Sequence, residues 1–153
     1  MGKAGRTTSA DTIQNDDRGL ILITKIESIE QTLDLVSQGA LEAHPAFMAT
    51  PISILLEVCN GCGAAGAKFD FVPDTIYGLS IRPACNIHDF DYYSGTDWHH
   101  KRRADIRFLV NCILIILPAS NWVTTILRVE RAVKYFLAVT LKGNDAYQKG
   151  KNL

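Results

Sequence analysis

A thiol, an imidazole, a carboxylate and a phenol follow one another at helical spacing in the middle of the chain. They belong to Cys85, His88, Asp89 and Tyr92, which fall at positions i, i+3, i+4 and i+7 and therefore project from one side of a helix. Asp105 lies in register with apolar residues of the next predicted helix, so its carboxylate is expected on the core-facing side and needs a partner there. A histidine held by this carboxylate can act as a general base toward water.

Two consecutive helices are predicted to position these side chains. The first is expected over residues 83–95 and the second over residues 97–117. The short turn at Gly95 makes the two helices antiparallel neighbours. His88 lies seven residues before this glycine and Asp105 lies ten residues after it, so facing side chains at the two positions are close enough to meet.

Residues nearer the N-terminus are predicted to form one helix and several irregular segments. Apolar residues recur mostly at helical spacing over residues 20–39, although residues 21–24 (Ile-Leu-Ile-Thr) could also begin a strand. The polar segment 1–17 is expected to lack fixed structure. The glycine-rich segment 59–66 and the segment 69–82 are expected to be loops.

A third helix is predicted in the C-terminal part of the chain. It begins at Ser120 or Asn121 and ends at Gly143, where a left-handed glycine would cap it. The fold class is therefore mainly α, with one domain over residues 18–153 that contains an N-terminal helix and three helices in a row.

Composition and charge limit the classes of protein to consider. The 153 residues are 47% apolar, which suits one domain with a real core. Sixteen basic and sixteen acidic residues balance, so bulk positive charge does not indicate a nucleic-acid binder. Residues 101–153 nevertheless carry ten basic and three acidic residues, which makes this part +7 and the rest −7. No apolar stretch reaches the length of a signal peptide at the start or of a membrane span elsewhere.

Several segments together resemble the phospholipase A2 superfamily. Residues 83–92 (PACNIHDFDY) resemble its active-site helix, whose signature is Cys, two residues, His-Asp, two residues and Tyr. Residues 60–63 (NGCG) are similar to the calcium loop, and residues 101–107 (KRRADIR) to the second helix with its histidine-orienting Asp. Residues 131–147 are similar to bacterial and phage members, so the resemblance covers residues 59–147.

This resemblance implies a phospholipase A2-like fold, a calcium cofactor and a role for each matching residue. His88 would deprotonate the attacking water, Asp105 would orient His88, and Tyr92 would hydrogen-bond Asp105. Asp89 would ligate Ca²⁺ with both carboxylate oxygens. The backbone carbonyls expected at the ion are those of Gly61, Gly63 and Ala65 or Gly66. The implied activity is that of a carboxylic ester hydrolase, which cleaves the sn-2 ester of glycerophospholipids at a membrane surface.

The resemblance also bears on the cysteines and on location. It favours two disulfides, Cys62 with Cys85 and Cys59 with Cys112. The family usually has further cysteines where this chain has Ala84 and Asp91, so fewer disulfides are expected here. Calcium levels sufficient for such a site and disulfides both belong outside the cytosol, so the enzyme is expected to act outside the producing cell.

Two alternatives come from other classes of protein. The spacing Cys59-x2-Cys62, twenty-two residues, then Cys85-x2-His88 suits a Cys3His zinc site in a noncatalytic binding or scaffold module. Such a site would leave the buried Asp105 without a purpose. The other alternative keeps the lipase fold in a membrane-active toxin or phage component, which the N-terminal helix would deliver.

The third predicted helix adds a possible surface for lipid. Arg128, Arg131 and Lys134 form a basic strip that either faces solvent or favours anionic lipid surfaces. Trp98 and Trp122 are expected to act either as anchors at an interface or as packing residues.

Overall fold

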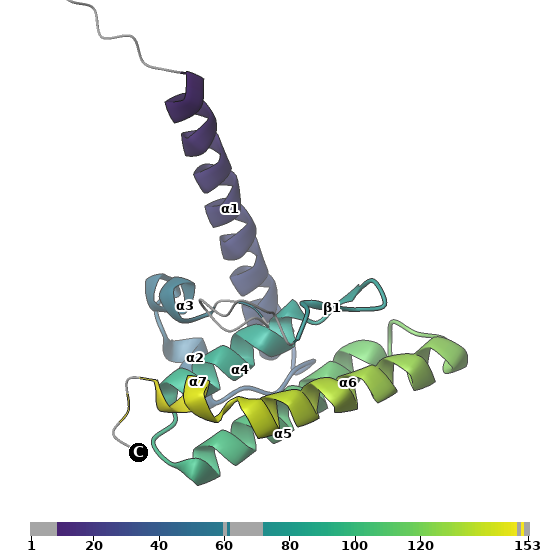
Figure 1. Ribbon diagram of the computed structural model, residues 1–153. Helices are drawn as coiled ribbons and strands as arrows, with labels where there is room; N and C mark the ends of the chain where they lie inside the picture. The colour runs from purple at the N-terminus through teal and green to yellow at the C-terminus, as the bar shows by residue number, and fades with distance from the viewer. Residues whose placement is uncertain (1–8, 60, 62–71, 150, 152–153) are drawn as a thin grey trace, which may run out of the picture.

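A computed structural model describes residues 9–59, 61, 72–149 and 151. The fold is mainly helical, which confirms the predicted class. The described residues form seven helices and one two-stranded hairpin (Figure 1). No helix among them is long and apolar enough to cross a membrane.

The N-terminal helix stands away from the rest of the molecule. Helix α1 (Ser9–Ser37) projects from the body over most of its length, and only its C-terminal part meets the other helices (Figure 1). The expectation that residues 9–17 lack fixed structure is corrected, because the helix begins at Ser9. These polar residues contain no proline, and adding residues to an existing helix costs far less than nucleating one.

Two short helices pack beside the end of α1. Helix α2 (Pro45–Ala49) and helix α3 (Ile52–Val58) each begin at or directly after a proline, whose fixed φ suits a first helical turn. With α1 and α4 they enclose one of two apolar clusters. The largest buried members of this cluster are Ile29, Phe47, Leu55, Ile87 and Phe90.

A small hairpin interrupts the segment that was expected to be irregular. Strands β1 (Thr75–Ile76) and β2 (Leu79–Ser80) pair antiparallel, which corrects the loop prediction for this part of residues 69–82. Tyr77 and Gly78 connect the strands with φ of 46° and 78°, as a tight hairpin turn requires. Two residues in each strand are too few for an alternating sequence pattern to reveal them.

The two helices predicted to carry the site are present as neighbours. Helix α4 (Arg82–Ser94) and helix α5 (Trp98–Ile116) lie within a few residues of the predicted bounds. The side chain of Asp97 caps α5 by accepting a hydrogen bond from the backbone N–H of His100. Between the helices Gly95 has no room for a side chain, since a Cβ there would lie 2.6 Å from the Tyr147 hydroxyl.

Two more helices follow α5, and the longer of them packs against it. Helix α6 (Trp122–Lys142) begins after its cap Asn121, and helix α7 (Asn144–Gln148) follows directly. The second apolar cluster lies between α4, α5, α6 and the hairpin. Gly143 ends α6 as expected, but its φ of −77° corrects the prediction of a left-handed cap. The glycine is needed for space, because a Cβ would lie 2.6 Å from the Tyr92 hydroxyl.

Candidate active site

The imidazole of His88 and the carboxylate of Asp105 meet between α4 and α5. Nε2 of His88 lies 3.1 Å from Oδ1 of Asp105. Both side chains are buried, with 8% and 2% of their surface exposed. The contact that the helical spacing predicted is therefore present. A buried carboxylate is costly without a partner, and the contact with His88 gives Asp105 the partner that its position facing the core requires.

Tyr92 completes the contact from the next turn of α4. Its hydroxyl donates a hydrogen bond of 2.7 Å to Oδ1 of Asp105, and its ring lies 4.1 Å from the imidazole of His88, centroid to centroid. Burial, followed by the negative charge of Asp105, raises the pKa of Tyr92 well above its ordinary value. The phenol therefore stays protonated and remains a donor to the carboxylate.

Lys101 is a fourth member of this cluster that sequence reasoning missed. Its Nζ donates to Oδ2 of Asp105 over 2.8 Å, and to the carbonyl oxygens of Val139 and Thr140 over 3.3 Å each. The residue is only 4% exposed. Lysine and aspartate lie four residues apart on α5, a spacing that brings side chains together on a helix and could have revealed the pair. We refer to His88, Tyr92, Lys101 and Asp105 as the Asp105 cluster.

The Asp105 cluster holds its central carboxylate ionised. Burial raises the pKa of Asp105, but hydrogen bonds from His88, Lys101 and Tyr92 outweigh burial, and the pKa lies below its ordinary value. All three partners donate to the charged form. An ionised Asp105 favours the His88 tautomer that carries its proton on Nε2, which leaves the lone pair of Nδ1 available to accept a proton.

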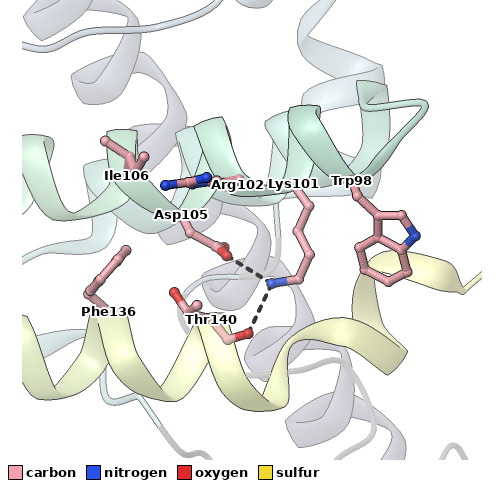
Figure 2. Close-up of a pocket in the computed structure, with 7 residues that line it drawn as sticks. All are labelled: Trp98, Lys101, Arg102, Asp105, Ile106, Phe136 and Thr140. Carbon is pink, nitrogen blue, oxygen red and sulfur yellow. Dashed lines mark hydrogen bonds and ion pairs between the residues drawn. The ribbon is translucent and has the colours of Figure 1, made fainter.

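A pocket reaches this cluster from the Lys101 side. It has a volume of about 410 Å³ and lies between α5 and α6. Figure 2 shows Lys101 extending from α5 toward α6 and contacting Asp105. The residues that line the pocket are Trp98, Lys101, Arg102, Asp105, Ile106, Phe136 and Thr140.

Asp89 follows His88 directly on α4. It is half-buried, and its negative charge contributes, after burial, to raising the pKa of the Cys59 thiol to about 12. Cys59 is the residue that caps the C-terminal end of α3, and the glycine-rich segment begins there. In that segment Gly61 has a φ of +85°, which favours glycine. The predicted ligands Gly63 and Ala65 lie outside the described residues.

One carboxylate together with the carbonyls of a glycine-rich segment would suit a hard cation. The charge of Asp89 acts on the Cys59 thiol, whereas a Cβ on Gly61 would lie 2.9 Å from Oδ1 of Asp74. Across the part of the chain that the structure describes, no group of three or more His, Cys, Asp or Glu side chains converges as a metal site. A calcium site here therefore depends on backbone carbonyls of the glycine-rich segment.

The described members of the alternative zinc site do not converge. Cys59 and Cys85 belong to the two separate apolar clusters. The thiol of Cys59 donates to the carbonyl oxygen of Asn86 over 3.3 Å, and Nε2 of His88 is engaged by Asp105. The fourth member, Cys62, lies outside the described residues. The three described residues do not support a Cys3His site.

The disulfide predicted between Cys59 and Cys112 is wrong. Both residues are buried free thiols. Cys59 packs with α1 and α3, whereas Cys112 packs between α5 and α6, so the helices separate them. Burial is the main cause that raises the pKa of each thiol to about 12, which keeps both protonated. The predicted pairing of Cys85 involves Cys62, outside the described residues, and stays a prediction.

An ion pair joins the two site helices at Asp91, one of the positions where the resemblance led us to expect a cysteine. Asp91 on α4 contacts the guanidinium of Arg107 on α5. Asp91 is 6% exposed, and burial raises its pKa while Arg107 opposes that effect. Ala84, the other such position, is fully buried in the apolar cluster. The contact between α4 and α5 is thus reinforced by charge at this point.

The chain was compared with family models, with curated proteins and with solved structures, and no match was found in any of the three.

Proposed function

We propose that this protein is a calcium-dependent, phospholipase A2-like hydrolase that cleaves the sn-2 ester of glycerophospholipids. The observation that carries the proposal is the contact of the buried His88 and Asp105, which sequence spacing and family resemblance both predict. Asp89 and the glycine-rich segment are the parts of the chain that the resemblance assigns to the ion. The fold proposed is that of the same superfamily.

The proposed chemistry uses His88 as the base. Nδ1 takes a proton from a water molecule while the water oxygen attacks the ester carbonyl carbon. Asp105 stabilises the imidazolium that forms, since it holds the Nε2 proton. The tetrahedral intermediate then expels the alkoxide of the lysophospholipid, which recovers the proton from Nδ1. The products are a free fatty acid and a lysophospholipid.

Tyr92 and Lys101 support this dyad without contacting substrate in the proposed scheme. Tyr92 donates to the same oxygen as His88, and Lys101 donates to the other oxygen. The carboxylate therefore cannot rotate without losing contacts at both oxygens. Both residues are positioning residues, because they act through Asp105.

Asp89 would hold calcium together with the carbonyls of Gly61, Gly63 and Ala65. When bound, the ion would polarise the ester carbonyl and stabilise the negative charge that develops on its oxygen. The substrate is then a phospholipid at a membrane surface, and the protein is a peripheral membrane partner.

The test measures fatty-acid release from phospholipid vesicles with calcium and with a chelator. We expect release that requires calcium and that His88→Gln abolishes. His99→Gln is the matched control, because His99 is exposed at the start of α5. No release from the wild type, together with one tightly bound zinc per chain, would instead favour the module built on Cys59, Cys62, Cys85 and His88. Equal release by wild type and His88→Gln would contradict the proposed base.

A further inference from the structure

One side of α6 carries a row of exposed side chains that are spaced alternately four and three residues apart. The row consists of Val123, Leu127, Glu130, Lys134, Leu137 and Leu141, and we call it the α6 seam. Its four apolar members have between 44% and 72% of their surface exposed. This spacing repeats every seven residues, which is the period at which two helices pack along their length in a coiled coil.

The fold does not bury the α6 seam. Ala132 and Tyr135 are the buried residues of α6, and they belong to the apolar cluster shared with α4 and α5. Ile126 and Val133 are also exposed and widen the seam along one edge. Helix α6 lies on the far side of the body from the projecting part of α1 (Figure 1). A contiguous apolar row that the described chain leaves open is typical of an interaction site.

The order of residue types makes the α6 seam complementary to itself. Two apolar residues lie at each end, and one acidic and one basic residue lie in the middle. Two copies of α6 can therefore be placed antiparallel around a two-fold axis beside Ala132. This arrangement forms three kinds of pair, each of them twice: Val123 with Leu141, Leu127 with Leu137, and Glu130 with Lys134.

The two charges in the middle of the seam select the antiparallel direction. Lys134 contacts Glu130 of its own helix, and both side chains are more than half exposed, so the same groups can reach a second copy. In a parallel pair in register, Glu130 would lie against Glu130 and Lys134 against Lys134, and like charges repel. The antiparallel pair replaces both repulsions with attractive contacts, which fixes the register as well as the direction.

We propose that two copies of this chain associate through the α6 seam as an antiparallel, two-fold symmetric dimer. The apolar pairs at both ends supply the affinity, because each removes apolar surface from water. The seam from Val123 to Leu141 is about 27 Å long at 1.5 Å per residue. One helix from each copy makes a small interface, so we expect the dimer to dissociate on dilution. The inference is independent of the proposed function, because the Asp105 cluster belongs to α4 and α5.

The position of the charges argues against a lipid bilayer as the occupant of the seam. Immersing the apolar row would carry Glu130 and Lys134 into the edge of the hydrocarbon, and burying an ion pair is costly. The seam contains one acid and one base, so it has no net charge with which to attract an anionic surface. A second copy instead offers each charge an opposite charge and each apolar residue an apolar one.

Sedimentation velocity of the full chain tests the dimer over protein concentrations from about 1 µM to about 300 µM. We expect a reversible equilibrium between monomer and dimer without larger species, because a two-fold contact closes on itself. Leu137→Glu should weaken association about a hundredfold, since symmetry removes its pairing with Leu127 twice. Ile21→Glu is the matched control: Ile21 is 65% exposed on α1, and this variant should dimerise as the wild type does.

Charge reversal tests the contact between Glu130 and Lys134 across the interface. Glu130→Lys and Lys134→Glu each place like charges in the middle of a homodimer, so each variant alone should stay monomeric over this concentration range. An equimolar mixture of the two variants gives every charge an opposite partner again and should dimerise as the wild type does.

The double variant Glu130→Lys/Lys134→Glu tests the direction of packing. In an antiparallel dimer it should associate with itself but not with fluorescently labelled wild type, because mixed pairs would bring like charges together. A parallel dimer predicts the opposite result for both pairings. All substituted positions are exposed, so circular dichroism should show unchanged helical content in every variant.

Four results would overturn the inference. The first is a monomeric wild type at every concentration, and the second is a dimer that Leu137→Glu leaves intact or that Ile21→Glu dissociates. The third is a mixture of the two single charge variants that stays monomeric. The fourth is association of the double variant with the wild type in preference to itself.

Discussion

Helix α4 carries two buried polar clusters on different sides, and the two differ in kind. Toward α5, His88 and Tyr92 contact the carboxylate of Asp105. Toward α1, the amide of Asn86 donates to the Thr32 hydroxyl over 3.0 Å and to the Ser28 hydroxyl over 3.1 Å. The first cluster contains groups that titrate, whereas the second is neutral. We call the second the Asn86 cluster.

The difference agrees with the proposal that the Asp105 cluster serves catalysis and the Asn86 cluster stabilises the fold. A neutral amide between two hydroxyls is satisfied by ordinary hydrogen bonds and needs no charge balance. The Asp105 cluster buries an ionised carboxylate and a lysine, and such groups cost desolvation that well-packed apolar residues would avoid. Stability alone does not explain a charged cluster at this position, whereas the proposed base held by a carboxylate would.

The largest expected effect is a loss of activity when His88 of the Asp105 cluster is replaced. His88→Gln should lower the rate of fatty-acid release by about three orders of magnitude, because the general base is lost. Its free energy of unfolding should change by less than about 1 kcal/mol, since Tyr92 and Lys101 still satisfy Asp105. Release assays and urea titrations measure the two quantities. A large loss of stability with unchanged release would assign the Asp105 cluster to the fold.

The next effect compares two lysines that each lie four residues from an acid. Lys101→Met should lower the free energy of unfolding by about 3 kcal/mol, because it leaves Oδ2 of the buried Asp105 without its donor. Lys134→Met is the control, as its ion pair with Glu130 is exposed on α6 and should contribute less than about 1 kcal/mol. Urea unfolding of both variants makes the comparison, and equal losses would contradict the burial argument.

A smaller loss of stability is expected in the Asn86 cluster. Asn86→Ala should cost about 2 kcal/mol, because it removes hydrogen bonds to Ser28 and Thr32 in a buried site. Hydrogen exchange should increase near those two residues on α1. Release of fatty acid should stay within about twofold of the wild type under conditions where the variant is folded. A loss of release as large as that of His88→Gln would show that the two clusters do not divide their tasks as we infer.

Tyr92→Phe tests the contribution of a single hydrogen bond to the Asp105 cluster. The variant should lose about 1 kcal/mol of stability, since Oδ1 of Asp105 keeps His88 as a partner. Release should fall less than in His88→Gln. An effect on release equal to that of His88→Gln would assign Tyr92 a direct role.

The pH dependence of stability should be small and should have a definite sign. The pKa of Asp105 is lower in the folded chain, because donated hydrogen bonds outweigh its burial. Its ionised form therefore stabilises the fold above the unfolded-state pKa, and this contribution disappears as the pH falls through the folded-state pKa. Urea titrations of wild type and Asp105→Asn should be run between about pH 6 and about pH 3. The difference between their free energies of unfolding should become smaller as the pH falls. A difference that widens toward acid would contradict the assignment.

The elements with long periodic patterns were predictable from sequence. The spacing of His88 and Asp105 around a short turn was enough to place them in contact, because helix geometry fixes where side chains point. The end of α6 at Gly143 was found for the wrong reason: tight packing against Tyr92, rather than a left-handed φ, requires glycine. A glycine at the end of a helix looks the same in the sequence whether it is required by a left-handed φ or by lack of space for a side chain.

Other features depend on contacts that sequence spacing does not encode. Lys101 lies in a run of charged residues that is typical of a solvated helix start, and only the arrival of α6 beside α5 buries it. Cys59 and Cys112 were paired because they remained after Cys62 and Cys85, but the order of helices places them in different clusters. Such errors arise where tertiary packing, rather than local pattern, decides the neighbours of a residue.

The central claim is that this chain uses His88, with Asp105 behind it, to hydrolyse the sn-2 ester of a phospholipid. The most direct test is release from vesicles whose phospholipid carries different labelled acyl chains at the sn-1 and sn-2 positions, measured with calcium for wild type and His88→Gln. The account predicts release of the sn-2 chain by the wild type and almost none by the variant. Release of the sn-1 chain, or no release of either chain by folded wild-type protein, would contradict it.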